Sequence, residues 1–122
     1  MAALEMAALD VRVPMTRRFV AMSGVVWINE RQAMVATMSH DRRITTCAIT
    51  RGSMTEPCYL AQAVRVIGDR QRVVILGPSS IRLALEREYV AQFQRPDRLV
   101  DVEWAPAPHL QDLVERLRIL AD

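Results

Sequence analysis

The most informative stretch of the chain is a short apolar run, residues 73–76, in which three of the four side chains are β-branched. Gly77-Pro78 ends the run, and Ser79 or Ser80 can then cap a helix whose apolar residues alternate with arginine and glutamate. An apolar run without polar alternation is typical of a strand buried on both faces. We therefore predict an interior strand within a sheet that helices cover.

Three more strands are predicted upstream of this run. Residues 19–28 are apolar and β-branched, and they end at the polar residues 29–32, which favour a tight turn. Residues 33–38 form the second predicted strand. A polar turn, residues 39–43, leads to the third strand at residues 44–50. Short polar turns between consecutive strands predict an antiparallel meander.

Three helices and an edge strand complete the pattern. Thr55 and Pro57 predict the start of the first helix, and Gly68 its end. The second follows the interior strand, and an apolar stripe over residues 110–120 predicts the third. Residues 99–104 alternate, with Val100, Val102 and Trp104 together on the apolar face, as in a half-buried edge strand.

This order of elements, β-β-β-α-β-α-β-α, limits the topology. Right-handed crossovers place the fourth strand parallel to the first, which gives the sheet order 3-2-1-4-5. We predict an α/β fold with a five-stranded mixed sheet flanked by helices, the ribonuclease-H-like arrangement. Residues 18–122 are predicted to form this single domain. Residues 1–17 are predicted to be an N-terminal arm, either disordered or packed against the domain.

The charge of the chain gives a weak indication of its partners. The formal net charge of +2 is too small to predict nucleic-acid binding by itself, but all 16 basic residues are arginine. Arginine suits phosphate and carboxylate contacts better than lysine does. The alternative is a solvated surface encoded by a GC-rich genome. The arginines considered as RNA-binding candidates are Arg42, Arg43, Arg51, Arg70 and Arg72.

Cysteine usage and hydropathy bear on the compartment. Cys47 and Cys58 have neither metal-site spacing nor the density of a secreted scaffold, so we expect buried free thiols in a reducing compartment. The first 17 residues lack the charge pattern of a secretory signal, and no apolar run is long enough to cross a bilayer. We expect a cytoplasmic protein that does not bind membranes.

Few residues suggest catalysis. A two-metal nuclease needs clustered carboxylates, whereas here Glu30 stands alone near the first strand, and Asp101 and Glu103 lie on the edge strand. His40 and His109 lack neighbouring partners in the sequence. We therefore predict no metal site and no cofactor. Trp27 and Trp104 are predicted to pack in the core or at an interface.

The turn Gly77-Pro78-Ser79-Ser80 is the candidate ligand site. It joins the carboxyl end of an interior strand to a helix, where backbone N–H groups and the helix dipole can hold an anion. The turn matches neither a phosphate-binding P-loop nor a nucleophile elbow. The alternative is a capped structural turn. A hydrolase with Ser79 as nucleophile would need a base that the sequence does not identify.

Two segments together resemble a known family. The sequence Val25-Val26-Trp27-Ile28-Asn29 followed by Gln32-Ala33-Met34-Val35 resembles the first hairpin of small bacterial proteins related to peptide-chain release factors. The stretch Val73 to Ser80, with Leu85 and the later Leu99-Val100-Asp101-Val102, resembles the second half of the same domain. In archaeal and eukaryotic release factors and their ribosome-rescue relatives, this is the middle domain. The resemblance implies the ribonuclease-H-like fold over about residues 19 to 121.

The chain also departs from that family. The catalytic tripeptide Gly-Gly-Gln is absent, and residues 51–57, where the loop that bears it would fall, are few and contain one glycine. The resemblance therefore implies an accessory protein that acts on ribosomes or in a stress response, without peptidyl-tRNA hydrolysis.

Three hypotheses follow for function. The first is a non-enzymatic module that binds the ribosome or RNA through one contiguous patch of the five candidate arginines. The second is a homo-oligomeric interaction protein without a nucleic-acid role, paired through an exposed sheet edge. The third is a small-ligand or hydrolytic site at the turn that begins at Gly77.

Overall fold

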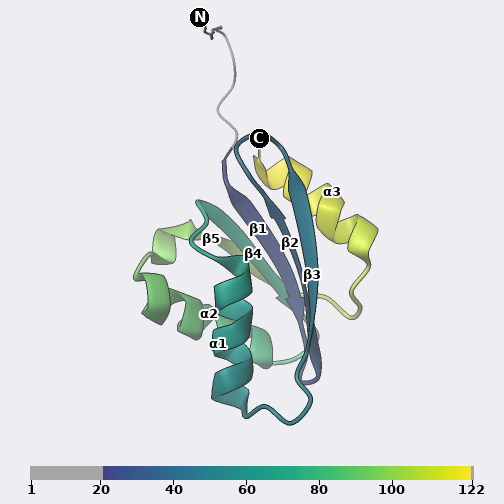
Figure 1. Cartoon of the computed structure of the whole chain (residues 1–122), viewed down its shortest axis with the longest axis vertical. Coiled ribbons are helices and arrows are strands. Elements are labelled where there is room, and N and C mark those ends of the chain that lie inside the picture. Colours follow the sequence, from purple (N-terminus) through teal and green to yellow (C-terminus); the bar gives the residue numbers. More distant parts are fainter. Residues whose placement is uncertain (1–20, 122) are drawn as a thin grey trace, which may run out of the picture.

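The computed structural model describes residues 21–121 and shows the predicted α/β architecture (Figure 1). Its elements are β1 (Ser23–Ile28), β2 (Gln32–Met38), β3 (Ile44–Thr50), α1 (Glu56–Ile67), β4 (Arg72–Gly77), α2 (Ile81–Phe93), a 3-10 turn (Pro96–Arg98), β5 (Leu99–Trp104) and α3 (Leu110–Ala121). The five strands form one sheet in the order β3-β2-β1-β4-β5. The predicted fold class and strand order are confirmed.

The interior strand lies where the apolar run predicts. β4 pairs in parallel with β1 on one side and with β5 on the other. Val73, Val74 and Ile75 are 0% exposed, because α1 and α2 cover one face of the sheet and α3 covers the other. Side chains alternate between the faces of a strand, so β4 contributes to both layers of core.

The ends of α1 follow local sequence. Thr55 is the N-cap and its hydroxyl accepts a hydrogen bond from the Cys58 N–H at 3.3 Å, while Pro57 occupies the first turn. Gly68 ends the helix at φ 74°, where its N–H donates to the Val64 carbonyl. At α2 the predicted capping position is right, since Ser80 is the N-cap, but no side-chain hydrogen bond caps the helix there.

The edge strand β5 departs from simple alternation. A bulge lets Val73 pair with Leu99 and Val74 with Asp101, so Val100 is an extra residue without a partner. Leu99 and Val102 consequently pack against the core on the same face, whereas Val100 is 54% exposed and Trp104 64% exposed. The predicted apolar face of Val100, Val102 and Trp104 is therefore wrong. Of the two expectations for Trp104, core packing is wrong, and packing at an interface stays a prediction.

The cysteines, the N-terminal arm and the absence of membrane-spanning helices are also predicted from the sequence. Cys47 and Cys58 are both exposed free thiols, contrary to the expected burial, because β3 is an edge strand and Cys58 lies on the outer side of α1. The predicted arm at residues 1–17 lies outside the described residues. Within residues 21–121, no helix has both the length and the apolar character that a bilayer crossing requires.

Candidate functional site

The carboxyl ends of β1 and β4 meet at one end of the sheet, where the chain leaves in opposite directions. After β1 it turns towards β2, and after β4 it crosses to α2 and β5. Ligands of open α/β sheets bind at such switch points. The turn of residues 29–31 and the turn Gly77-Pro78-Ser79-Ser80 therefore lie side by side at the natural position of a site.

A carboxylate occupies the turn that is the candidate anion site. The Ser79 hydroxyl donates to Glu30 Oε2 at 2.5 Å, and Arg82 Nη1 donates to the Ser79 carbonyl at 2.6 Å. The negative charge of Glu30 opposes a second anion at the same hydroxyl. Anion binding at Gly77, Pro78, Ser79 and Ser80 stays a prediction, and a structural role for the turn is the better supported alternative.

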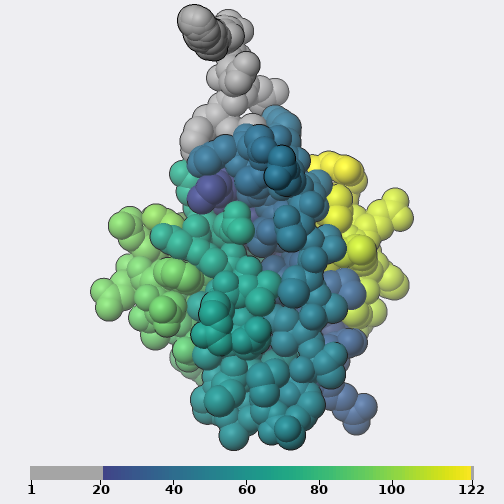
Figure 2. Space-filling view, in the orientation of Figure 1, coloured from purple at the N-terminus to yellow at the C-terminus, as the bar shows by residue number. Residues whose placement is uncertain are grey.

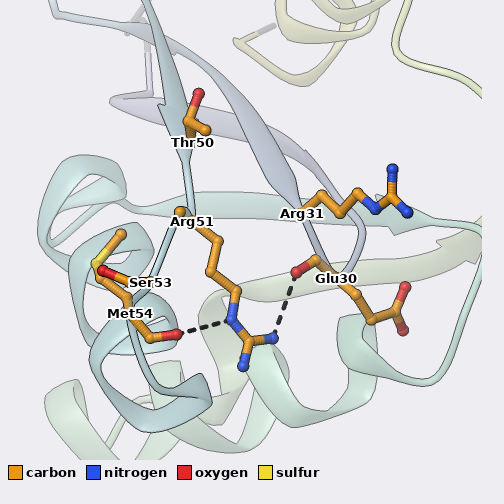
Figure 3. Close-up of a pocket in the computed structure, with 7 residues that line it drawn as sticks. Glu30, Arg31, Thr50, Arg51, Ser53 and Met54 are labelled. Atoms are coloured by element: carbon orange, nitrogen blue, oxygen red, sulfur yellow. Dashed lines mark hydrogen bonds between the residues drawn. The ribbon is translucent and has the colours of Figure 1, made fainter.

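The loop after β3 is braced by one arginine (Figure 3). Arg51 Nε donates to the Met54 carbonyl at 2.9 Å and Nη1 to the Glu30 carbonyl at 3.3 Å. The Arg51 guanidinium carbon also lies 5.8 Å from the centre of the Tyr59 ring, within the range of a cation–π contact. Arg51 thus links the loop to the β1–β2 turn and to α1. Two of its N–H groups donate hydrogen bonds to backbone carbonyls.

Tyr59 of α1 also contacts the β1–β2 turn. Its side chain is buried, and its hydroxyl donates to the Asn29 carbonyl at 2.9 Å. Burial raises the pKa of Tyr59 to about 12, a rise that Arg51 opposes and Glu30 adds to. The phenol is therefore neutral at physiological pH and acts as a hydrogen-bond donor.

Two hollows share Glu30 at this end of the sheet. The larger is about 530 Å³ and the smaller about 210 Å³. The larger is lined by Glu30, Arg31, Thr50, Arg51, Gly52, Ser53 and Met54. The smaller is lined by Glu30, Glu56, Ser80, Ile81, Leu83, Ala84 and Arg87. Both mix acidic and basic groups, and no group of three or more histidine, cysteine, aspartate or glutamate side chains in residues 21–121 could hold a metal.

Four of the candidate arginines lie at the opposite end of the sheet. Arg42 and Arg43 are in the β2–β3 turn, Arg70 lies in the connection that leads into β4, and Arg72 is the first residue of β4. Register explains the grouping, since Ser23 of β1 pairs with both Met38 and Arg72. These four residues form what we call the arginine end of the sheet.

Helix carbonyls hold two of these arginines in place. Arg70 Nε donates to the Ile67 carbonyl at 2.9 Å, and Arg72 Nη1 donates to the Leu120 carbonyl at 2.7 Å. A cation at a helix C-terminus is stabilised by the helix dipole. Both arginines therefore stabilise the ends of the helices that they contact. Arg43, with a side chain 79% exposed, lies 3.7 Å from the Asp41 carboxylate.

The expected single patch of five arginines is wrong. Arg51 follows β3 at its far end, so the length of that strand, about 20 Å, separates it from Arg43. Sequence analysis also missed Arg98, which contacts Asp69 and donates to the Arg70 carbonyl at 3.2 Å. No local signal identifies Arg98, because the 3-10 turn and the bulge set its position.

A separate charged cluster lies between β5 and α3. Arg116 contacts the Glu103 carboxylate through both terminal nitrogens and approaches Asp101 at 3.9 Å. Hydrogen bonds from Arg116 and then Asp101 lower the pKa of Glu103 to about 2. The pKa of Asp101 is raised, first by its hydrogen bond with Glu103. The cluster stabilises the contact between α3 and the sheet edge.

Comparison with known proteins gives a structural likeness only. No known family profile matches the sequence, and no characterised protein matches it by sequence. The fold is similar to part of Pelota from Archaeoglobus fulgidus, with a TM-score of 0.61, 11% identity, and coverage of 82% of this chain and 31% of that one. It is also similar to part of Dom34 from S. cerevisiae, with a TM-score of 0.53, 9% identity, and coverage of 82% and 36%. The chain thus spans about a third of each, and the likeness establishes the fold.

Proposed function

We propose that this chain is a non-enzymatic binding module of the translation machinery. The observation that carries the proposal is the shared fold, which spans 82% of this chain in Pelota and in Dom34. Dom34 is described as a translation termination-like factor involved in RNA quality control pathways that interacts with Hbs1. Since many functions share one fold, the proposal needs a surface that suits the partner.

The arginine end of the sheet is that surface. Arg42 and Arg43 are exposed in a turn, and Arg70 and Arg72 keep donors beyond those used by helix carbonyls, because a guanidinium has five N–H groups. Bidentate contacts of arginine suit phosphate oxygens. We propose that this end faces ribosomal RNA, and that the site of Arg51 does not.

The non-enzymatic part of the proposal rests on sequence and on geometry. The Gly-Gly-Gln tripeptide is absent, and the loop in its place is short and tied down by Arg51. Ser79 has Glu30 as a hydrogen-bond partner but has no histidine beside it in the described turn. The Ser79 hydroxyl is therefore better explained as a link between two turns than as a nucleophile.

Cosedimentation of the purified chain with ribosomes tests the proposal. Binding is expected at low salt, with a steep decline as salt rises and loss after nuclease treatment. The Arg42→Glu/Arg43→Glu variant should bind at least about tenfold more weakly. The matched control is Arg31→Glu/Arg87→Glu, which changes net charge equally at the other end of the sheet. Equal loss in both variants, or no binding at low salt, would contradict the proposal.

A further inference from the structure

In the part of the chain that the structure describes, the outer edge of β3 has no neighbouring strand or helix. β3 is an edge strand of the sheet, and within residues 21–121 only β2 pairs with it. Residues 45–48 are exposed on both faces, because α1 and α3 cover β1 and β2 rather than β3. Figure 2 shows this segment at the surface, beside the helix α1. Half of the backbone N–H and C=O groups of such an edge point away from the sheet and are able to accept another strand.

The two edges of the sheet differ in how they are protected. β5 carries a bulge and two acidic residues, Asp101 and Glu103, which are devices that prevent strand pairing. β3 pairs with β2 through seven consecutive residues without a bulge, and it contains neither a charged residue nor a proline. β3 is thus a regular, neutral edge that is open to β-augmentation.

The residues at both ends of β3 carry more positive than negative charge. At the start, Arg42 and Arg43 outnumber Asp41, and at the end, Arg31 and Arg51 outnumber Glu30. The larger hollow lies beside Thr50 and is lined by Glu30, Arg31 and Arg51. Figure 3 shows the Arg31 side chain pointing away from the turn. The edge is therefore neutral in the middle and basic at both ends.

We propose that β3 binds an extended peptide as a sixth, antiparallel strand, with a neutral β-branched centre and an acidic residue at each end. A second copy of this chain fits less well, because antiparallel pairing of β3 with itself brings basic ends together. The peptide site is a function beyond the proposed contact with RNA, and it does not depend on that contact.

Fluorescence polarisation with labelled nine-residue peptides tests the proposal on the full chain. The probe alternates valine and threonine and has a glutamate at each end. One control has a lysine at each end, and another has a central proline, which cannot donate a backbone hydrogen bond. The glutamate-ended probe should bind about tenfold more tightly than the lysine-ended one, and the proline control should not bind.

Hydrogen exchange locates the bound peptide. The probe should slow amide exchange in residues 44–50 and leave residues 99–104 unchanged. The Arg43→Glu variant should prefer a probe with lysine at its C-terminal end over the reversed arrangement, since antiparallel pairing places that end beside position 43. Equal affinity for the glutamate- and lysine-ended probes, no binding, or protection at β5 would overturn the proposal. A peptide-free dimer whose β3 amides are already protected would overturn it in favour of self-pairing.

Discussion

The carbonyl oxygen of Ile28 lies 2.3 Å from the point where a side chain at Gly77 would place its Cβ atom. Real Cβ atoms do not approach a backbone oxygen so closely, so only glycine fits at the end of β4. This requirement explains the glycine of the Gly77-Pro78-Ser79-Ser80 turn through packing between β1 and β4, without a bound ligand.

Replacement of that glycine should be costly. We expect Gly77→Ala to lower the free energy of unfolding by about 3 kcal/mol, because the backbone of β1 or β4 must move. Gly24→Ala in β1 is the matched control, since its added Cβ meets Ile67 Cγ2 at 3.4 Å, an ordinary contact. Urea denaturation compares the two variants, and equal losses would contradict this account of Gly77.

The two buried tyrosines should differ in what their hydroxyls contribute. The Tyr89 hydroxyl donates to the Gly68 carbonyl at 2.8 Å and accepts from the Arg70 N–H at 3.1 Å, whereas the Tyr59 hydroxyl donates once. Tyr89→Phe leaves two backbone groups without their partner and should cost about 2–3 kcal/mol, against about 1 kcal/mol for Tyr59→Phe. Thermal or urea unfolding of both variants measures the difference, and the reverse order would refute it.

The C-cap of α2 should be improvable. Gln94 has φ 55° and ψ 38°, a left-handed conformation that glycine adopts without strain. Gln94→Gly should raise the free energy of unfolding by about 0.5–1 kcal/mol. The control Gln92→Gly, inside the same helix, should lower it by about 1 kcal/mol. Chemical denaturation gives both values, and a loss of stability in Gln94→Gly would show that its side chain matters more than its backbone.

The cluster between β5 and α3 should make stability depend on acid. The pKa of Glu103 falls from 4.5 when unfolded to about 2 when folded, so its stabilisation is present above pH 4.5 and is lost as pH falls towards 2. The side chains of Glu103 and Arg116 are about a third exposed, which limits the contribution to about 1 kcal/mol. Glu103→Gln should therefore lose stability at pH 7 and show a flatter decline between pH 5 and 2.

Asp101→Asn provides the contrasting variant for this cluster. The pKa of Asp101 is raised by its hydrogen bond with Glu103, so the ionised carboxyl is disfavoured in the folded protein. Removal of this charge should leave stability at pH 7 unchanged or slightly higher. A loss as large as that of Glu103→Gln would show that Arg116 depends on Asp101 rather than on Glu103.

The fold could be predicted because local signals and hydrophobic pattern agree. The neutral run at residues 73–76, the cap at Thr55 and the stop at Gly68 each depend on neighbouring residues alone, and each was right. The surface of β5 could not be predicted, because one extra residue, Val100, reverses which side chains face the core. Pattern analysis assumes a constant period of two and has no signal for a bulge.

The candidate surfaces could be predicted only in part. Four of the arginines lie at the same end of the sheet because strands that are far apart in sequence begin or end there, which the predicted strand order already implies. The partners of Arg70 and Arg72 are backbone carbonyls of α1 and α3, and composition gives no indication of them. The link between Glu30 and Ser79 joins residues 49 positions apart and depends on the parallel pairing of β1 with β4.

The two tryptophans differ in exposure and can serve as two separate intrinsic fluorescence probes. Trp27 is 2% exposed and donates through Nε1 to the Ala105 carbonyl at 3.0 Å, whereas Trp104 stands 64% exposed at the end of β5. Emission from the indole in the interior will shift to the red when the chain denatures, while emission from the indole in water will be quenched first by iodide. A variant in which Trp27 is the single tryptophan therefore reports unfolding. A variant in which Trp104 is the single tryptophan reports binding of a partner next to β5.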